Sequence, residues 1–407
     1  MTHAHTPAVC SRLPHVGTTI FSVMSALATE CQAVNLGQGF PDFDCDPRLL
    51  DAVEAALRAG HNQYPPMPGV PALRQALARK TEALYGRRYD PEHEITVTAG
   101  ATQAIFSAIL AVVQPGDEVI VLEPCYDSYV PNIELAGALP VRVPLGADFR
   151  PDFDALAAAI GPRTRALLIN SPHNPSGRVW QQADMLRLQA LLAGTEVILI
   201  SDEVYEHMVY DGQPHQSAAR FDEHMVFDGQ PHQSAARFAD LAARALVVSS
   251  FGKTFHVTGW KVGSVLAPAP LMAEFRKVHQ FNVFTVNTPM QHALAAYLHD
   301  PAPYLQLPDF YAAKRDRFRA GLARTRFGLL PCEGSYFQCV DYSALAVPER
   351  DLEPDAFCRW LTRAVGVAAI PLSAFYAQPP AAQRLIRFCF AKQDATLDAA
   401  LARLARL

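Results

Sequence analysis

The sequence lacks any apolar run that approaches the roughly 18 residues needed to cross a membrane, and its N-terminus has no basic segment followed by an apolar core. We therefore expect no membrane span, no secretory leader and a cytoplasmic protein. The eight cysteines include no Cys-x-x-Cys pair and no Cys/His cluster with zinc-like spacing. This pattern argues against a disulfide framework and a metal site, so we expect reduced thiols and no bound metal.

An excess of positive charge is also missing. The net charge is -5 with histidine neutral, so nothing draws the whole chain towards nucleic acid or anionic lipid. Lysine is scarce, with six residues against 29 arginines. Half of the residues are apolar and 18% are charged, which is typical of a soluble globular protein. The 407 residues suit two domains of ordinary size.

Strand-like and helix-like patterns alternate from Ile95 onward, and this alternation predicts an α/β fold. A helical pattern over Ala101–Val113 lies between the first two of these strands. The alternation predicts a mostly parallel sheet with helices on both faces, and ligands bind beyond the carboxyl ends of such strands. The predicted strands are Glu94–Thr98, Glu118–Leu122, Ala166–Ile169, Val197–Ile200 and Ala245–Val248.

Past about residue 290 the pattern changes, which predicts a second, smaller α+β domain. We expect the large domain to span 45–290 and the small domain to combine 291–407 with 1–44. The N-terminal part contributes an opening helix at Thr18–Glu30, and helices at Asp51–Ala59 and Val70–Tyr85 follow. The C-terminal part is predicted to contain helices at Met290–His299, Phe310–Arg324 and Asp355–Ala364, and strands at Tyr336–Val340 and Leu385–Phe390.

A tandem duplication interrupts the large domain. Residues 206–222 and 223–239 are identical at fifteen of 17 positions. Two copies do not make a repeat architecture, because stacked units need at least three. Each copy is polar and carries turn signals, so we interpret the pair as a duplicated surface connector, which a loop tolerates because closure entropy grows slowly with length.

Two residues that follow buried strands are candidates for chemistry. Lys253, after Ala245–Val248, would by itself be a solvated surface charge. Gly252 beside it permits close approach of a ligand, and a partly desolvated amine suits imine formation. Asp202, after Val197–Ile200, is either a helix cap or an anion that faces a protonated ring nitrogen, as in the electron sink of pyridoxal phosphate.

Several other residues follow or lie in predicted strands, and each also has an ordinary structural explanation. Tyr205 either packs or donates its hydroxyl, and Asn174 lies in a common Asn-Pro turn. Tyr126 either stacks on a ligand or fills core. Arg387 either binds a carboxylate in a bidentate geometry or is one of many surface arginines. The residues that could surround a phosphate are Gly100, Ala101, Thr102, Ser250 and Lys261.

Ten segments in order carry a family resemblance that covers almost the whole chain. They are GTTIFSVMSAL, NLGQGFPDF, HNQYPPMPG, TAGATQAIF, PGDEVIVLEPCYDSY, SPHNPSG, SDEVYEHM, SSFGKTFHVTGWKVG, VNTPMQ and IRFCFAK. The sequence resembles the class I aminotransferases of fold type I, especially the methionine and kynurenine (glutamine) aminotransferase branch. The resemblance implies a large domain with a mostly parallel seven-stranded sheet, a smaller α+β domain and pyridoxal 5′-phosphate (PLP) as cofactor.

The resemblance also implies roles for the candidate residues. Lys253 forms the imine with PLP and then shuttles a proton, and Asp202 pairs with the pyridine nitrogen. In such enzymes Tyr64 reaches the phosphate of the neighbouring site, which implies a homodimer. The other implied contacts are Tyr205 and Asn174 at the ring oxygen, Gly100, Ala101, Thr102, Ser250 and Lys261 at the phosphate, Tyr126 on the ring, and Arg387, Asn174 and Gly39 at the substrate carboxylate.

The implied reaction moves an amino group from an L-amino acid to a 2-oxo acid. The aromatic pair in Phe281–Thr285 suits a large apolar or thioether side chain, and Thr285 stands where kynurenine-type enzymes often carry histidine, which favours a methionine-type enzyme. A carbon–sulfur β-lyase on the same fold and a non-catalytic PLP-binding protein are alternatives. Asp202 and Lys253 are 51 positions apart, and removal of one 17-residue copy of the duplication would leave 34, which resembles the usual separation in the family. A third alternative is therefore that the duplication leaves this chain inactive.

Overall fold

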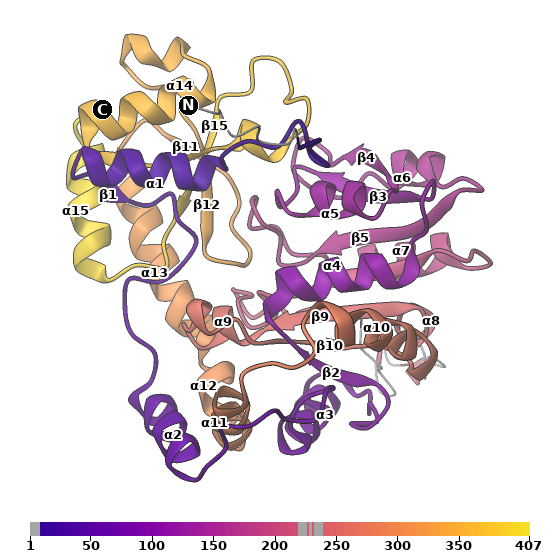
Figure 1. Ribbon diagram of the computed structural model, residues 1–407. Coiled ribbons are helices and arrows are strands. Elements are labelled where there is room, and N and C mark those ends of the chain that lie inside the picture. Colours follow the sequence, from indigo (N-terminus) through magenta and orange to yellow (C-terminus); the bar gives the residue numbers. More distant parts are fainter. Residues whose placement is uncertain (1–8, 219–225, 228–229, 232–238) are drawn as a thin grey trace, which may run out of the picture.

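The computed structural model describes residues 9–218, 226–227, 230–231 and 239–407 of the chain. Its central feature is a seven-stranded sheet with the strand order β2-β10-β9-β6-β5-β3-β4 (Figure 1). The strands are β2 (Ile95–Thr98), β3 (Glu118–Glu123), β4 (Leu139–Pro144), β5 (Thr164–Asn170), β6 (Ile198–Asp202), β9 (Ala245–Ser250) and β10 (Gly263–Leu266).

The large sheet is parallel apart from β10, which runs antiparallel to both of its neighbours. The prediction of a mostly parallel seven-stranded sheet is confirmed. Because β10 runs opposite to β2 and β9, these two strands still point the same way. Five carboxyl ends that precede candidate residues therefore meet at one edge, and Lys261, which precedes β10, enters the sheet from that edge.

Alternate residues of the strands face two separate cores. In β5, Ala166 and Leu168 belong to one core and Leu167 and Ile169 to the other, as the period of two requires. Helices α4 (Gly100–Val112), α5 (Tyr129–Leu135) and α10 (Ala269–Asn282) cover the first face. The second face is covered by α3 (Pro71–Tyr85), α6 (Phe153–Ala159), α7 (Gln182–Leu192) and α11 (Thr288–Tyr297).

A second unit is built around an antiparallel sheet of order β11-β12-β15-β14, which lies at the upper left in Figure 1, to the left of β3 and β4. A third core joins it to the opening helix α1 (Ile20–Glu30), and β1 (Val34–Asn35) pairs in parallel with β13 (Val367–Ala368). The N-terminal segment thus packs with the C-terminal part, while the domain boundaries stay a prediction. The remaining elements are β11 (Gly328–Leu329), β12 (Phe337–Asp341), β14 (Ile370–Pro371), β15 (Leu385–Cys389), α12 (Ala302–Leu305), α13 (Leu307–Leu322), α14 (Pro354–Trp360) and α15 (Asp394–Leu404).

Helix α2 (Pro47–Arg58) begins four residues before the predicted start at Asp51. Asp46 accepts a hydrogen bond from the Arg48 N–H and caps the helix, and Pro47 fits its first turn. The prediction missed this start because it relied on apolar periodicity alone. In the part of the chain that the structure describes, no helix combines the length and apolarity that a membrane crossing requires.

The first copy of the duplication is not the surface connector that we expected. Glu206–Tyr210 and His215–Ala218 are buried, and only Asp211–Pro214 between them is exposed. Some of its buried polar residues have partners, and His215 lies 3.0 Å from a Glu203 oxygen. Of the second copy, the described part comprises strands β7 (Val226–Phe227) and β8 (Gln230–Pro231) and the first residue of α8 (Ala239–Ala242). Its other residues lie outside the described part.

Candidate active site

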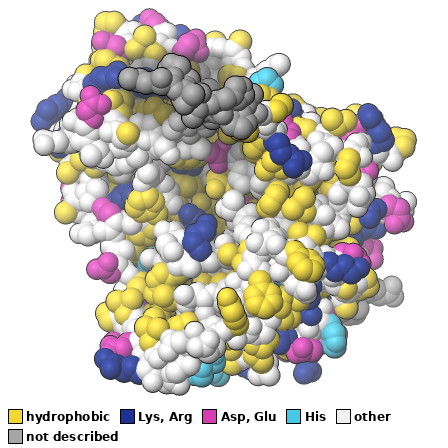
Figure 2. Space-filling model, viewed as in Figure 1, with side chains coloured by type: hydrophobic (Ala, Val, Ile, Leu, Met, Phe, Trp, Pro, Cys, Tyr) yellow, Lys and Arg dark blue, Asp and Glu magenta, His cyan; other side chains and the backbone are white. Residues whose placement is uncertain are grey.

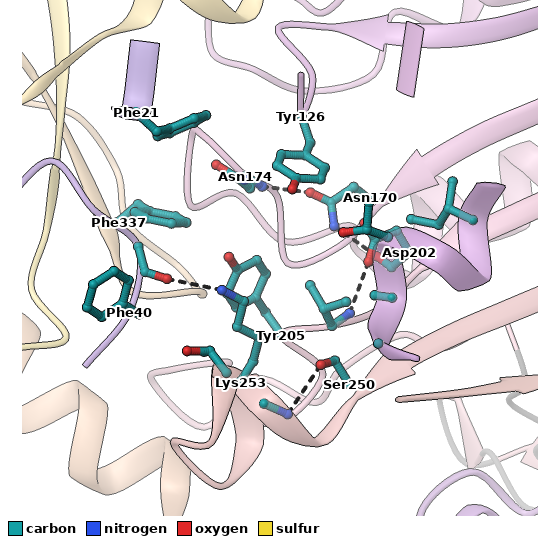
Figure 3. A pocket seen from close by; sticks show the side chains of 18 of the residues that line it. Phe21, Phe40, Tyr126, Asn170, Asn174, Asp202, Tyr205, Ser250, Lys253 and Phe337 are labelled. Atoms are coloured by element: carbon teal, nitrogen blue, oxygen red, sulfur yellow. Dashed lines mark hydrogen bonds between the residues drawn. The ribbon is translucent and has the colours of Figure 1, made fainter. Parts of the chain in front are cut away.

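A cavity of ≈ 310 Å³ lies at the carboxyl edge of the large sheet, where the two units meet. Every predicted site residue except Tyr64 lines it (Figure 3). These residues are Gly39, Gly100, Ala101, Thr102, Tyr126, Asn174, Asp202, Tyr205, Ser250, Lys253, Lys261 and Arg387. Strand ends far apart in the sequence therefore converge as predicted.

Lys253 lies on the short helix α9 (Phe251–Thr254), directly after β9. Ser250 caps this helix by accepting a hydrogen bond from the Gly252 N–H at 3.2 Å. A Cβ on Gly252 would lie 2.9 Å from the Thr258 backbone, so this close turn requires glycine. The Lys253 Nζ donates to the Gly39 carbonyl oxygen at 3.0 Å. Burial lowers the pKa of the amine to about 8, which distinguishes it from a solvated surface lysine.

Asp202 ends β6 and is fully enclosed, with 4% of its surface exposed. The Tyr129 hydroxyl donates to its Oδ2 at 2.5 Å, and the Val204 N–H lies 3.3 Å from its Oδ1. Burial raises the pKa of this carboxyl to about 6, against the lowering effect of the Tyr129 hydrogen bond. The site thus holds an acid and an amine whose pKa values both move towards neutrality.

Arg387, on β15, brings a buried guanidinium to the other side of the cavity. One of its terminal nitrogens donates to the Asn174 Oδ1 at 2.7 Å and the other to the Gly37 carbonyl oxygen at 3.1 Å. Its Nε donates to no residue that the structure describes. The Phe337 ring centroid lies 3.9 Å from the guanidinium carbon. A buried cation with an open donor fits a planar anion such as a carboxylate.

Helix α4 begins at this edge and offers a site for a second anion. Gly100 has a φ of +78°, and a Cβ on it would lie 3.5 Å from the Lys261 Nζ, so the lysine lies against the helix start. The first backbone N–H groups of a helix have no partner within it, and its dipole favours negative charge. The Tyr126 hydroxyl bonds to Thr102 in the first turn. The helix start and Lys261 together fit a phosphate.

Several residues that line the same cavity were not predicted from the sequence. They are Phe21, Gln38, Phe40, Ile105, Tyr129, Asn170, Val204, Thr258 and Phe337. Asn170 links two predicted residues, because its Nδ2 donates to the Asp202 carbonyl oxygen at 2.9 Å and its Oδ1 accepts from the Asn174 N–H at 2.7 Å. Its position at the end of a predicted strand was the signal that could have identified it.

Tyr64 is the one predicted residue that the structure does not bring to the cavity. Its side chain is 82% exposed and packs edge-on against Phe284, with the ring centroids 5.5 Å apart. Within one chain, therefore, it belongs to the surface rather than to the site.

Comparison with known proteins identifies the family. Residues 32–404 match the model of the class I and II aminotransferases. The chain belongs to this family. Methionine aminotransferase of Escherichia coli is 51% identical over 399 residues, which are 98% of each chain. Probable N-succinyldiaminopimelate aminotransferase of Mycobacterium tuberculosis is 43% identical over 410 residues, again 98% of each.

Solved structures of aminotransferases share the fold. An E. coli protein with a methionine aminotransferase function superposes with a TM-score of 0.91 at 50% identity, covering 99% of this aminotransferase and 100% of that chain. By sequence, rat kynurenine–oxoglutarate transaminase 3 is a further relative, 35% identical over 418 residues, which cover 96% of this chain and 88% of that protein. The enzyme is thus a transaminase of a family that works with PLP.

Proposed function

We propose that this aminotransferase binds PLP through Lys253 and transfers the amino group of methionine, or of another large apolar or aromatic L-amino acid, to a 2-oxo acid. One observation carries the proposal: a desolvated amine (Lys253) and a buried carboxylate (Asp202) face the same cavity from neighbouring parallel strands. The methionine part rests on the relative that is 51% identical.

The residues of the cavity fit PLP at three points. Asp202 supplies the anion for a protonated ring nitrogen, with Tyr205 and Asn174 near the ring oxygen. Gly100, Ala101, Thr102, Ser250 and Lys261 line the part of the cavity that would hold the phosphate, and Tyr126 would cover the ring. When bound, PLP supplies an electron-withdrawing ring that makes the α-proton of the substrate acidic.

Lys253 performs the proton transfer. An amine with a pKa of about 8 is partly unprotonated near neutral pH, so its Nζ accepts a proton from the substrate α-carbon and later returns one. Arg387, Asn174 and the backbone at Gly39 hold the substrate carboxylate and thereby fix which bond at the α-carbon faces the lysine.

The substrate side chain has an apolar environment. Phe21, Phe40 and Phe337 line the cavity, and the centroids of Phe21 and Phe337 lie 5.4 Å and 3.9 Å from the Arg387 guanidinium carbon. A side chain attached next to a carboxylate on Arg387 therefore meets aromatic rings, which suits a thioether or an aromatic group.

We also propose that the enzyme is a cytoplasmic homodimer. Tyr64 and Phe281 are exposed by 82% and 87%, and Phe284 beside Tyr64 by 46%, which is unusual for large side chains unless a partner covers them. Hydrophobic side chains gather on the lower part of the face shown in Figure 2, where Figure 1 labels α2, α3 and α11. The eight free cysteines suit a reducing compartment.

Lys253→Ala tests the proposed function. The variant should lose roughly 10³-fold or more in turnover of methionine with a 2-oxo acid, while it still binds PLP without a covalent bond. Formation of the 2-oxo product measures turnover, and the visible absorption of bound PLP reports the covalent link.

Lys277→Ala is the matched control, because Lys277 is exposed and its only ion pair among the described residues is with Glu274, one turn away. It should leave both measurements unchanged. Normal transamination by Lys253→Ala would overturn the assignment. Release of pyruvate from a cysteine conjugate without any 2-oxo acid would instead identify a β-lyase.

A further inference from the structure

Among the residues that the structure describes, the carboxylate of Asp202 has one strong partner, and it is a tyrosine outside the set of predicted residues. Tyr129 begins α5, just after the loop that follows β3. Its side chain is buried, with 2% exposed, and its hydroxyl lies 2.5 Å from the Asp202 Oδ2. The other contact of the carboxylate, with the Val204 N–H, is longer at 3.3 Å. No salt bridge to Asp202 occurs among the described residues, where Lys253 acts on it only at longer range.

The direction of the Tyr129–Asp202 hydrogen bond is fixed. Burial and the nearby carboxylate raise the pKa of the Tyr129 phenol well above its ordinary value, so the hydroxyl keeps its proton and donates it. Burial alone would favour the neutral form of Asp202, and the Tyr129 hydroxyl is the strongest interaction that opposes this effect. A hydrogen bond to a charged acceptor is about twice as strong as one between neutral groups.

Tyr129 also packs against a second predicted residue of the site, Tyr126. Its ring lies edge-on to Tyr126, with the centroids 5.7 Å apart and the planes at 83°. The start of α5 therefore positions both the ring that would cover PLP and the carboxylate that would face its nitrogen. Neither contact depends on the substrate.

We propose that Tyr129 is a positioning residue that keeps the Asp202 carboxylate ionised and oriented towards the ring nitrogen of PLP. This inference rests on the proposed function, because it assumes that PLP occupies the cavity. Tyr129 acts through Asp202 and takes no proton itself.

Removal of the hydroxyl should change PLP binding in a pH-dependent way. Without the donor, the pKa of Asp202 in the empty site rises further, so the carboxyl is neutral over a wider pH range. A neutral carboxyl does not neutralise the charge of a protonated ring nitrogen. At low pH the carboxyl must lose its proton when PLP binds, and the free energy of this ionisation weakens binding. At high pH, Asp202 is ionised in both proteins before PLP binds, so the difference disappears.

The test compares Tyr129→Phe with Tyr89→Phe. Both variants remove one hydroxyl from a fully buried ring, and the Tyr89 hydroxyl has no hydrogen-bond partner among the described residues. Titration of the unloaded proteins with PLP, followed by protein fluorescence, should show roughly tenfold weaker binding for Tyr129→Phe at about pH 6 and nearly equal binding at about pH 8.5. Tyr89→Phe should follow the unaltered enzyme at both pH values.

A spectroscopic measurement supplies a second readout. With PLP labelled with ¹⁵N in the ring, the nitrogen resonance of Tyr129→Phe should shift towards that of an unprotonated pyridine, because the more basic Asp202 retains the proton. In an Asp202→Asn background, Tyr129→Phe should add no pH dependence, as a double-mutant cycle requires.

Three outcomes would overturn the inference while leaving the proposed function intact: equal PLP affinity at all pH values, a uniform loss equal to that of Tyr89→Phe, or an unshifted nitrogen resonance. Failure of the unaltered enzyme to bind PLP would overturn the proposed function itself. The two failures are therefore distinguishable.

Discussion

At the scale of single residues, Arg387 shows how the site is prepared for an anion. Its side chain is 1% exposed, and burial lowers the pKa of its guanidinium. A buried cation without an anionic partner is unfavourable, and here the compensation comes from the carbonyl of Gly37, the amide oxygen of Asn174 and aromatic faces. A substrate carboxylate would complete this arrangement.

Arg387→Lys should raise KM for the amino acid by roughly tenfold or more, with a smaller change in kcat. A lysine keeps the charge but loses the planar pair of donors, so substrate binding suffers more than proton transfer. Steady-state kinetics with methionine would measure both parameters. Arg384→Lys is the matched control, because Arg384 precedes the same strand but bonds backbone carbonyls away from the cavity. An unchanged KM in Arg387→Lys would contradict the proposed carboxylate site.

The sequence predicted those site residues that follow strands or belong to segments shared with a family. Lys253, Asp202 and Asn174 are of this kind, because a local pattern locates each of them. Tyr129 and Phe337 escaped prediction because their roles depend on contacts across the fold: Tyr129 bonds a residue 73 positions away. Only the packing of α5 against the sheet brings that hydroxyl to the carboxylate, and no spacing in the sequence records it.

At the scale of elements, apolar runs predicted the buried strands well. Strand β4 escaped prediction because it is the edge strand, with Val143 its only buried side chain. Strand β10 is buried but has four residues of which only Val265 and Leu266 are large and apolar, so it gives little signal. Its direction, opposite to the rest of the sheet, follows from the chain's return at Lys261 rather than from local composition.

The first copy of the duplication connects the two units of the molecule. Val209 forms a bridge with Gly334, and the Tyr210 N–H donates to the Glu333 carbonyl at 2.9 Å. Both carboxylate oxygens of Asp211 accept from Arg315, at 2.7 Å and 2.8 Å. The prediction of an exposed connector was wrong because polarity alone does not separate a solvated segment from one whose polar groups are paired.

At the other end of this copy, Glu206 fixes its start to the large sheet. It accepts hydrogen bonds from Lys80 at 2.7 Å, Tyr85 at 2.5 Å and Ser249 at 2.6 Å. The Lys80 ammonium is the main charge that holds the pKa of the buried Glu206 carboxyl below its ordinary value. Ser249 precedes the strand end that carries Lys253, so the first copy contacts the segment that positions the proposed catalytic amine.

Deletion of one copy at a time tests which residues of the duplication matter. Deletion of 223–239 keeps every contact just described and shortens the connection by 17 residues, so the variant should retain activity and be at least as stable. Deletion of 206–222 joins Tyr205 to Glu223 and places Phe227 where Tyr210 stood. It should be about 1 kcal/mol less stable, because Tyr210 donates to the Ser335 carbonyl and phenylalanine does not.

Urea unfolding of the two deletion variants and the full chain would measure these differences. Each deletion variant is the matched control for the other, since both have the same length and differ only at Tyr210/Phe227 and Asp222/Ala239. Loss of activity on deletion of 223–239 would show that the second copy has a role of its own. Equal stability of the two variants would contradict the predicted contribution of the Tyr210 hydroxyl to the free energy of unfolding.

At the scale of the whole molecule, the proposed dimer shares its sites between subunits. If Tyr64 completes the neighbouring site, a Lys253→Ala subunit paired with a Tyr64→Ala subunit contains one site with both defects and one with neither. Mixing the two variants under conditions that exchange subunits should therefore restore activity above the mean of the separate proteins. The highest yield is about one quarter of normal, because half of the dimers are mixed and each has one intact site.

Activity of the mixture would be compared with that of each variant alone, and sedimentation equilibrium would confirm the dimer. Lys277→Ala mixed with Lys253→Ala serves as a control, since it dilutes the defect without complementing it. A mixture that never exceeds the mean of its components would contradict a shared site.

The antiparallel strand β10 bears on which forms of vitamin B6 the proposed site would select. Gly100 and Lys253 follow β2 and β9, and β10 lies between these two strands, so the anion site and the amine belong to different strand ends of one edge. A ligand that engages both must carry an anionic group and an aldehyde, which PLP bears on neighbouring carbons of its ring. Pyridoxal without its phosphate would engage only the amine, and pyridoxine phosphate has no aldehyde to react with it. The two strand ends together would therefore favour PLP over either of these forms.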